Sequence, residues 1–237
     1  MKLIGKMIQL KINDINVTVE QGTTILDAAK KVGVHIPTLC HLNLEDFGVV
    51  NKSANCRVCV VEDEDTGKLV PSCAQEVKDG MRIQTDSLKA VMGRRTNLEL
   101  ILSNHPQDCL VCVKNLDCEL QDLAHELNIK EIHYQGEKMS HPKDETSFGI
   151  IKDTNKCIMC RRCVTMCNDI QTVGVLGPLK RGFDSVVATA FHLDLNQTSC
   201  TFCGQCVSVC PTGALAETND SPKVWRALND PKKHVIV

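Results

Sequence analysis

Cysteine is the residue that most restricts how this chain can fold. Fifteen of its 237 residues are cysteines, whereas the aromatic residues make up only 3%. The cysteine count is odd, many cysteines stand three residues apart, and segment 1–10 has no secretory leader pattern. Because disulfides belong to oxidising compartments, this usage favours bound metal as the cross-link of a core that is poor in large side chains.

The second half of the chain carries one cysteine pattern twice. Segments 157–167 and 200–210 both read C-x2-C-x2-C-x3-C. In the bacterial ferredoxin run of this form, the fourth cysteine ligates the other cluster. Pro211 fits that signature, Asn168 departs from it, and zinc, the alternative, rarely uses triple C-x2-C steps. The repeat predicts two 4Fe–4S clusters with these crossed ligand sets: Cys157, Cys160, Cys163 and Cys210 for one, and Cys167, Cys200, Cys203 and Cys206 for the other.

Four cysteines in the first third of the chain form a C-x2-C pair with two outliers, similar to the plant-type ferredoxin site. The pair reads Cys56-Arg57-Val58-Cys59, and it resembles the N-terminal 2Fe–2S module of iron-only hydrogenases and respiratory complex I, which has a β-grasp fold. The loop from Cys40 to Cys56 is longer than is usual in that family, and structural zinc is the alternative. The resemblance implies these 2Fe–2S ligands: Cys40, Cys56, Cys59 and Cys73.

The remaining three cysteines follow a histidine in the pattern H-x3-C-x2-C-x5-C. Spacing alone leaves His105 undecided between a metal ligand and an ordinary packed or solvated histidine. The same pattern occurs in the hydrogenase and complex I modules, where the imidazole completes a 4Fe–4S cluster. With His105, the fifteen thiols become sixteen donors, which fill four sets of four. The resemblance therefore implies a third 4Fe–4S cluster with these ligands: His105, Cys109, Cys112 and Cys118.

Local patterns predict an α+β chain. Alternating apolar and polar residues predict two hairpins and a last short strand, at 7–12 with 15–19, at 57–62 with 68–72, and at 81–84. Helical spacing predicts three helices, at 25–32, from an N-cap at Asp86 to Pro106, and at 119–127. The polar stretch 136–147 reads as a linker.

Three cluster modules in series follow from these elements and the resemblance. We expect a β-grasp 2Fe–2S domain of the plant-type ferredoxin class at 1–84 and a small helical His/Cys-ligated 4Fe–4S domain at 85–135. A bacterial-type ferredoxin domain with two 4Fe–4S clusters is expected at 136–220. The tail at 221–237, with its apolar end, is expected to dock a partner.

Charge and hydropathy exclude several classes of function. The formal net charge is −2, and there is no Lys/Arg-rich block beyond pairs such as Arg161-Arg162, which are expected to face solvent or a partner. The chain therefore lacks the electrostatic footprint of a nucleic-acid-binding protein. No stretch approaches the roughly 18 apolar residues of a membrane span, so we expect a soluble, cytoplasmic protein.

The resemblance extends over essentially the whole chain. In order, the ligand groups match the accessory-cluster region of iron-only hydrogenases and the N-terminal part of the large iron–sulfur subunit of complex I. The small diaphorase subunit of NAD-reducing nickel–iron hydrogenases shares this layout. The sequence offers no further cysteines for a hydrogen-activating cluster, no nickel-site motif pair and no Gly-rich dinucleotide fingerprint. We therefore expect no catalytic residue in this chain.

An electron-transfer role in an NAD-linked hydrogenase is what the resemblance implies, with one 2Fe–2S and three 4Fe–4S clusters as cofactors. The expected partners are a flavin- and NAD-binding diaphorase subunit, the small and large subunits of a nickel–iron hydrogenase, and ferredoxin if the complex bifurcates electrons. Three alternatives stay open: the equivalent subunit of a complex I-like or formate dehydrogenase complex, an iron-only hydrogenase lacking its catalytic domain, and a stand-alone ferredoxin.

Overall fold

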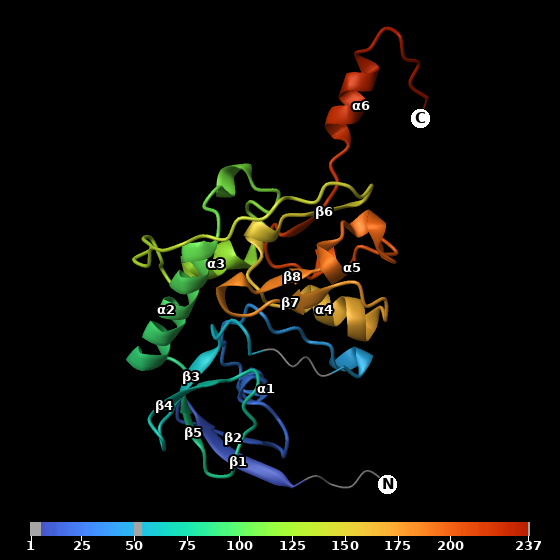
Figure 1. The fold of residues 1–237 in the computed structure, drawn as a ribbon. Coiled ribbons are helices and arrows are strands. Elements are labelled where there is room, and N and C mark those ends of the chain that lie inside the picture. The colour runs from blue at the N-terminus through green and yellow to red at the C-terminus, as the bar shows by residue number, and fades with distance from the viewer. Residues whose placement is uncertain (1–5, 50–53, 237) are drawn as a thin grey trace, which may run out of the picture.

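A mixed five-stranded sheet forms the N-terminal part of the fold in the computed structural model, which describes residues 6–49 and 54–236 (Figure 1). β1 (Met7–Ile12) and β2 (Ile15–Glu20) form the first predicted hairpin. Its turn residues, Asn13 and Asp14, have φ values of 47° and 65°. Two-residue hairpin turns require such left-handed conformations, and Asn and Asp adopt them more readily than most residues.

The strand order of the sheet is β2-β1-β5-β3-β4. β3 (Val60–Asp63) and β4 (Lys68–Pro71) form the second predicted hairpin. β5 (Arg82–Gln84) lies between the two hairpins, parallel to β1 and antiparallel to β3. β5, the last of these five strands in the sequence, is therefore the central strand of the sheet, and it joins the two hairpins into one layer.

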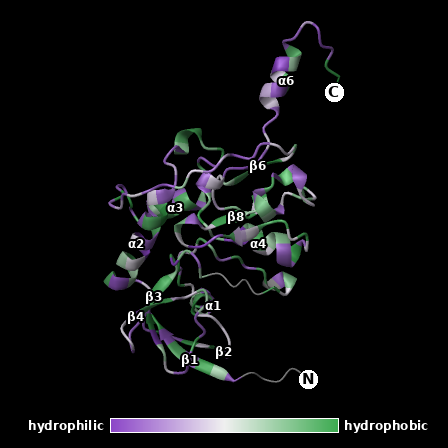
Figure 2. Ribbon diagram, in the orientation of Figure 1, coloured by the Kyte–Doolittle hydropathy of each residue, from purple (hydrophilic) through white to green (hydrophobic). Residues whose placement is uncertain are grey.

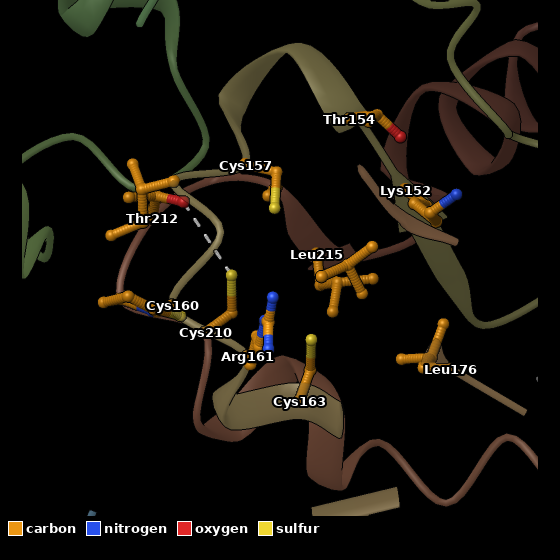
Figure 3. Close-up of a pocket in the computed structure, with 14 residues that line it drawn as sticks. Lys152, Thr154, Cys157, Cys160, Arg161, Cys163, Leu176, Cys210, Thr212 and Leu215 are labelled. Carbon is orange, nitrogen blue, oxygen red and sulfur yellow. Dashed lines mark hydrogen bonds between the residues drawn. The ribbon is translucent and has the colours of Figure 1, made fainter. Parts of the chain in front are cut away.

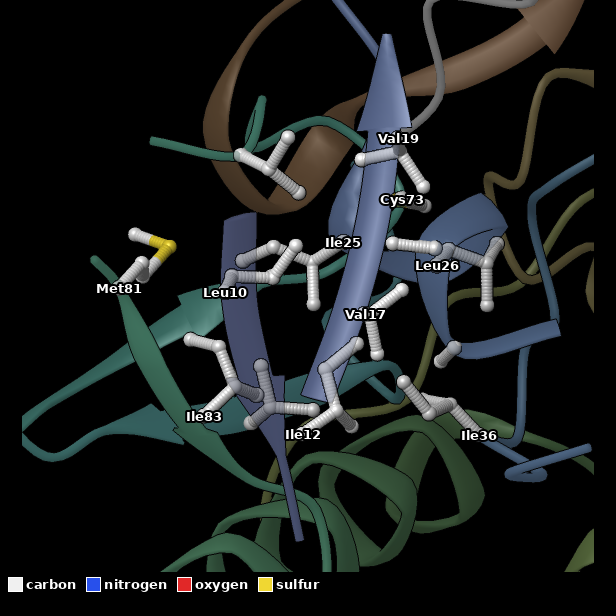
Figure 4. Packing of buried hydrophobic residues seen from close by; sticks show 14 of the residues in the cluster. Leu10, Ile12, Val17, Val19, Ile25, Leu26, Ile36, Cys73, Met81 and Ile83 are labelled. Atoms are coloured by element: carbon white, nitrogen blue, oxygen red, sulfur yellow. The ribbon is translucent and has the colours of Figure 1, made fainter. Parts of the chain in front are cut away.

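Helix α1 (Ile25–Lys31) covers one face of this sheet. It begins after Thr24, whose side-chain oxygen caps the helix by accepting a hydrogen bond from the Asp27 amide at 3.1 Å. Figure 4 shows Leu10 of β1 and Val17 of β2 packed with Ile25 of α1. Each fully buried aliphatic side chain of this kind contributes about 1.5–3 kcal/mol, which gives the sheet an apolar core of its own.

Two further helices follow the sheet. α2 (Leu88–Asn104) begins after Ser87, whose Oγ accepts a hydrogen bond from the Ala90 amide at 3.2 Å. The prediction of Asp86 as the N-cap is therefore wrong by one residue, because Ser and Asp cap helices almost equally well. α2 ends before Pro106 as predicted, and α3 (Glu119–Glu126) occupies the expected position.

The second half of the chain contains short elements connected by long irregular segments. β6 pairs antiparallel with β9, and β7 pairs with β8, in two small ladders that the sequence patterns did not predict. In the sequence, the one-turn helix α4 lies between β6 and β7, and the one-turn helix α5 lies between β8 and β9. The bounds of these elements are β6 (Ile150–Lys152), α4 (Arg162–Thr165), β7 (Gly177–Leu179), β8 (Val186–Ala188), α5 (Gln205–Ser208) and β9 (Leu215–Glu217).

The cysteine repeat is also a repeat of backbone conformation. Met159 and Phe202, which are equivalent in the two runs, have φ values of 55° and 53°. Arg161 and Gly204, the next equivalent pair, have φ values of 64° and 75° and lie at the starts of α4 and α5. Each run thus has two residues in the left-handed region of φ and ψ, and the backbone bends at these residues so that the cysteines lie on one side of it.

The tail carries α6 (Ser221–Leu228), which stands clear of the rest of the fold in Figure 1. Figure 2 shows hydrophobic residues on β3 and β8 inside the body, whereas α6 carries strongly hydrophilic residues as well as apolar ones. Val224, Trp225 and Leu228 of this helix are exposed. Within the described ranges, no helix is long and apolar enough to cross a membrane.

The mixture of sheet and helix confirms the α+β class. The predicted domain limits stay predictions, and their outermost residues, 1–5 and 237, lie outside the described part of the chain. The same holds for residues 50–53 of the long loop between Cys40 and Cys56.

Candidate metal centres

Four thiols line one cavity at the centre of the second half. Three come from the first cysteine run, at Cys157, Cys160 and Cys163, and the fourth, Cys210, comes from the end of the second run. The cavity has about 450 Å³ of empty space, its mouth included. Figure 3 shows the sulfurs of Cys157, Cys163 and Cys210 turned toward this space. These are the four residues that the crossed-ligand prediction placed together.

A second cavity repeats the arrangement with the roles of the two runs exchanged. It is lined by three cysteines of the second run and by the last cysteine of the first run, within about 430 Å³ of empty space. The first run can deliver its last cysteine to this cavity because α4 continues into a π-helical turn over Met166–Ile170. The four thiols are Cys167, Cys200, Cys203 and Cys206.

Burial keeps several of these thiols from ionising by themselves. It raises the pKa of Cys160 and that of Cys206 to about 12, and the pKa of Cys163 rises well above its ordinary value for the same reason. Neighbouring cysteines raise the pKa of Cys163 and Cys206 further. A thiolate in such a place needs an adjacent cation, which bound metal supplies, so the donor sets fit a metal group.

The spacing of the donors bears on which metal group they fit. Among the residues that the structure describes, no three His, Cys, Asp or Glu side chains converge as a site for a single metal ion. A zinc ion would hold four sulfurs about 2.3 Å from one point. Four thiols drawn from C-x2-C-x2-C-x3-C runs are instead the donor set of a cluster of several metal and sulfur atoms, and zinc sites rarely use such runs.

The first predicted set lies beside the N-terminal sheet, and all four of its cysteines are buried. The sulfurs of Cys59 and Cys73 are 3.3 Å apart. Hydrogen bonds from Cys56 and Cys73 lower the pKa of Cys40, and the contact with Cys40 raises the pKa of Cys56. The structure thus brings the whole set together as closely packed, buried thiols.

The middle set is brought together only in part. Cys109 is exposed, Cys112 is half-buried and Cys118 is buried, and the first two act electrostatically on the third. No described contact joins the His105 ring to these thiols. Its Nδ1 atom is buried and has no hydrogen-bond partner among the described residues. Burial first, and Lys156 next, lower the pKa of His105 to about 4, so the ring is neutral near pH 7, as a metal-binding imidazole must be.

One apolar cluster connects three of the four sets. It contains cysteines of the first set, the middle set and the first cavity, and aliphatic side chains separate them from water. Its buried members are Leu39, Cys40, Cys56, Val58, Leu98, Cys118, Leu120, Leu123 and Cys160. Donors of three of the four candidate centres therefore lie in one shared apolar core.

Three family models match the chain in series. A 2Fe-2S iron-sulfur cluster binding domain matches residues 5–87, the NADH-ubiquinone oxidoreductase-G iron-sulfur binding region matches residues 94–133, and a 4Fe-4S dicluster domain matches residues 156–214. Each matched region contains the donors predicted for it. This chain is an iron–sulfur protein.

Relatives of the iron–sulfur protein confirm the likeness indicated by the sequence. It is 54% identical to the NADP-reducing hydrogenase subunit HndD of Solidesulfovibrio fructosivorans over 98% of this chain and 40% of that relative. It is 39% identical to an NADH-quinone oxidoreductase subunit of Rhizobium meliloti, over 88% of this chain and 24% of the relative. The chain thus spans less than half the length of these two curated relatives.

A solved structure shares the fold. The crystal structure of an NAD+-reducing nickel–iron hydrogenase in the H2-reduced state aligns with a TM-score of 0.79 and 28% sequence identity. The alignment covers 89% of the iron–sulfur protein and 87% of the matched chain. The same arrangement of elements therefore occurs in a hydrogenase subunit of similar length.

Sequence patterns missed several residues that surround the donors. Arg162, expected at the surface, is only 6% exposed and forms a bidentate ion pair with Glu119 at 2.5 and 2.7 Å. Arg94 is equally buried, donates from Nε to the Val60 carbonyl at 2.9 Å and lies near Cys59. Arg94 belongs to a predicted helix and Arg162 to a cysteine run, but their partners lie 34 and 43 residues away, beyond the reach of local patterns.

Proposed function

We propose that this iron–sulfur protein relays single electrons through one 2Fe–2S and three 4Fe–4S clusters. The carrying observation is the pair of cavities, each lined by three thiols of one cysteine run and one thiol of the other. That exchange is expected of a two-cluster ferredoxin. The ligand sets are Cys40, Cys56, Cys59 and Cys73 for 2Fe–2S, and His105, Cys109, Cys112 and Cys118, then Cys157, Cys160, Cys163 and Cys210, then Cys167, Cys200, Cys203 and Cys206 for the three 4Fe–4S clusters.

The ligand sets divide over three modules. A β-grasp domain at 1–84, a helical domain at 85–135 and a two-cluster ferredoxin domain at 136–220 follow one another, and the tail at 221–237 docks a partner. The five-stranded sheet, the α2–α3 pair and the two short ladders fall within these ranges, which supports the division. The exposed apolar residues of α6 support the role of the tail.

Bound iron–sulfur clusters supply one-electron redox chemistry. The residues of this chain place the donor sets side by side and keep water from the space between them. The shared apolar cluster does this for the first set, the middle set and Cys160. Such a shell lowers solvent access and the local dielectric, both of which affect redox potential.

The partners are a flavin- and NAD(P)-binding diaphorase subunit and a hydrogenase of the nickel–iron type, in the cytoplasm, with ferredoxin as a third partner if the complex bifurcates electrons. HndD is by name a subunit of an NADP-reducing hydrogenase, and the aligned structure is that of an NAD+-reducing nickel–iron hydrogenase. Both relatives link hydrogenase activity to a nicotinamide cofactor, which supports this assignment.

A second candidate is the accessory-cluster region of an iron-only hydrogenase. The match to HndD, at 54% identity, spans only 40% of that relative, which favours this reading over a stand-alone ferredoxin. The two candidates share the same ligand sets and differ in the metal of the hydrogen-activating site that receives the electrons.

Anaerobic isolation of the protein with its native partners tests the proposal. Four clusters correspond to about 14 iron atoms per chain, with EPR signals from several centres after reduction. Nickel in the complex selects the first candidate, iron as the only metal selects the second, and molybdenum points to a formate dehydrogenase. Iron and sulfide far below four clusters' worth would overturn the ligand assignment.

A further inference from the structure

Lys156 is a buried cation beside the middle set. Its side chain is 11% exposed, and its ammonium nitrogen lies 3.3 Å from a carboxylate oxygen of Asp108. Burial disfavours the charged form of this ammonium, whereas the nearby Cys112 sulfur and Asp108 favour it and raise the pKa of Lys156 above its ordinary value. A Cβ atom built on Gly213 would lie 3.3 Å from the Lys156 stem and 2.8 Å from the Cys112 sulfur, so the lysine stem and this sulfur border the same small space beside Gly213.

The main chain fixes Lys156 in this position. Its carbonyl accepts a hydrogen bond from the Thr212 hydroxyl at 2.8 Å, and its amide donates to the Asp153 carbonyl at 3.1 Å. Thr212 is 1% exposed and lies 3.9 Å from the Cys210 sulfur. Lys156 therefore differs from a mobile surface lysine, because both ends of the residue are held between the middle set and the first cavity.

Burying an ammonium is unfavourable unless negative partners compensate for it. Asp108 supplies one partner, but its side chain is 45% exposed and its charge is partly screened by water. The Cys112 sulfur, as a metal-bound thiolate, is the other. In contrast, among the described residues that line the cavity of Cys167, Cys200, Cys203 and Cys206 there is no lysine or arginine.

We propose that Lys156 sets the redox potential of the cluster that Cys112 helps to hold. This rests on the proposed function. A reduced cluster carries one more negative charge than its oxidised form, so a fixed ammonium beside a ligand sulfur stabilises the reduced state more strongly than the oxidised state. Lys156 thus raises the potential of the middle cluster, and it acts as a positioned charge rather than as a ligand.

The test compares four variants by redox titration monitored by EPR, with iron and sulfide counts for each protein. Lys156→Met removes the charge and the N–H donors, Lys156→Gln removes the charge but keeps an N–H donor, and Lys156→Arg keeps the charge. Lys138→Met removes an exposed lysine as the matched control. A Cys112→Ser variant identifies the signal of the middle cluster, because that signal should be lost or altered.

With full cluster content, Lys156→Met and Lys156→Gln should lower the midpoint potential of the middle cluster more than that of any other cluster. Lys156→Arg should keep the midpoint potential close to that of the wild type, and Lys138→Met should leave it unchanged. Unchanged potentials in both neutral variants would overturn the inference while leaving the proposed function intact. Loss of the middle cluster in both would also overturn it, since Lys156 would then be needed for binding. A wild-type protein without clusters would instead contradict the proposed function.

Discussion

The side-chain amide of Asn55 donates a hydrogen bond to the main-chain carbonyl of Cys160 at 3.2 Å. Asn55 directly precedes Cys56 of the first set, and Cys160 belongs to the first cavity, 105 residues further along the chain. The contact fixes the N-terminal sheet region against the second half at the point where two donor sets approach each other.

Asn55→Ala should loosen this junction. Loss of one partly buried hydrogen bond should lower the free energy of unfolding by about 1 kcal/mol and slow electron exchange with the first centre. Rapid freeze-quench EPR after mixing with reductant would follow the appearance of the 2Fe–2S signal. Asn219→Ala is the control, because Asn219 accepts a hydrogen bond from the nearby Ser221 amide in the tail, away from the donor sets. Equal rates in both variants would show that the contact is not needed for exchange.

Double cysteine variants test the crossed ligand sets. If Cys163 and Cys210 hold the same cluster, the Cys163→Ser, Cys210→Ser double variant should lose about four iron atoms, as each single variant does. The pair Cys163→Ser and Cys167→Ser, from one cysteine run but different cavities, should lose about eight. Iron analysis of the purified proteins distinguishes these outcomes, and the reverse pattern would mean that each run holds its own cluster.

Gly213→Ala should disturb the middle centre. The added Cβ would lie 2.8 Å from the Cys112 sulfur, closer than real Cβ contacts allow. Overpacking of this kind costs about 1–3 kcal/mol, and the thiol must move to relieve it. The middle-cluster EPR signal should weaken or broaden, whereas Gly149→Ala, where no atom lies within 4 Å, should leave the spectrum unchanged. A normal signal in Gly213→Ala would show that Cys112 can move freely.

Glu119→Gln should destabilise the protein through Arg162. The guanidinium is 6% exposed, so removing the carboxylate leaves a buried charge without its partner. The free energy of unfolding should fall by roughly 2–3 kcal/mol, less than for a fully buried pair because Glu119 is itself half exposed. Anaerobic denaturant titration measures the change. Asp220→Asn, which breaks the exposed pair with Lys223, should cost about 0–1 kcal/mol.

Removal of iron should affect the two halves of the chain differently. The core of the sheet region is mainly aliphatic, and the cysteines among its described buried residues are Cys59 and Cys73. In contrast, cysteines make up much of the core around β6–β9. After anaerobic chelation, hydrogen exchange should stay slow in β1 and β5 and become fast in β6 and β9. Uniform loss of protection would mean that the sheet also depends on metal.

Local patterns were sufficient where an element is determined by neighbouring residues. The Asn13-Asp14 turn and the Thr24 cap are of this kind. The β6–β9 ladder was missed because it pairs Ile150 with Glu217 through strands too short to show alternation. Cysteine spacing predicted which thiols line each cavity, but Lys156 carries no such signal, since only the fold brings it to Cys112. The place of His105 as a donor rests on the family resemblance, because spacing does not separate it from other histidines.

The shared core of the donor sets limits how this protein can be taken apart. Leu39 and Val58 belong to the N-terminal region, yet they pack in the same cluster as Leu98 and Leu120 from the helices that follow. A free-standing carrier made from the first 84 residues would present these side chains to water. Protein engineers who wish to transplant that redox unit would need to redesign the exposed face with polar residues, or to transfer the adjoining helices with it.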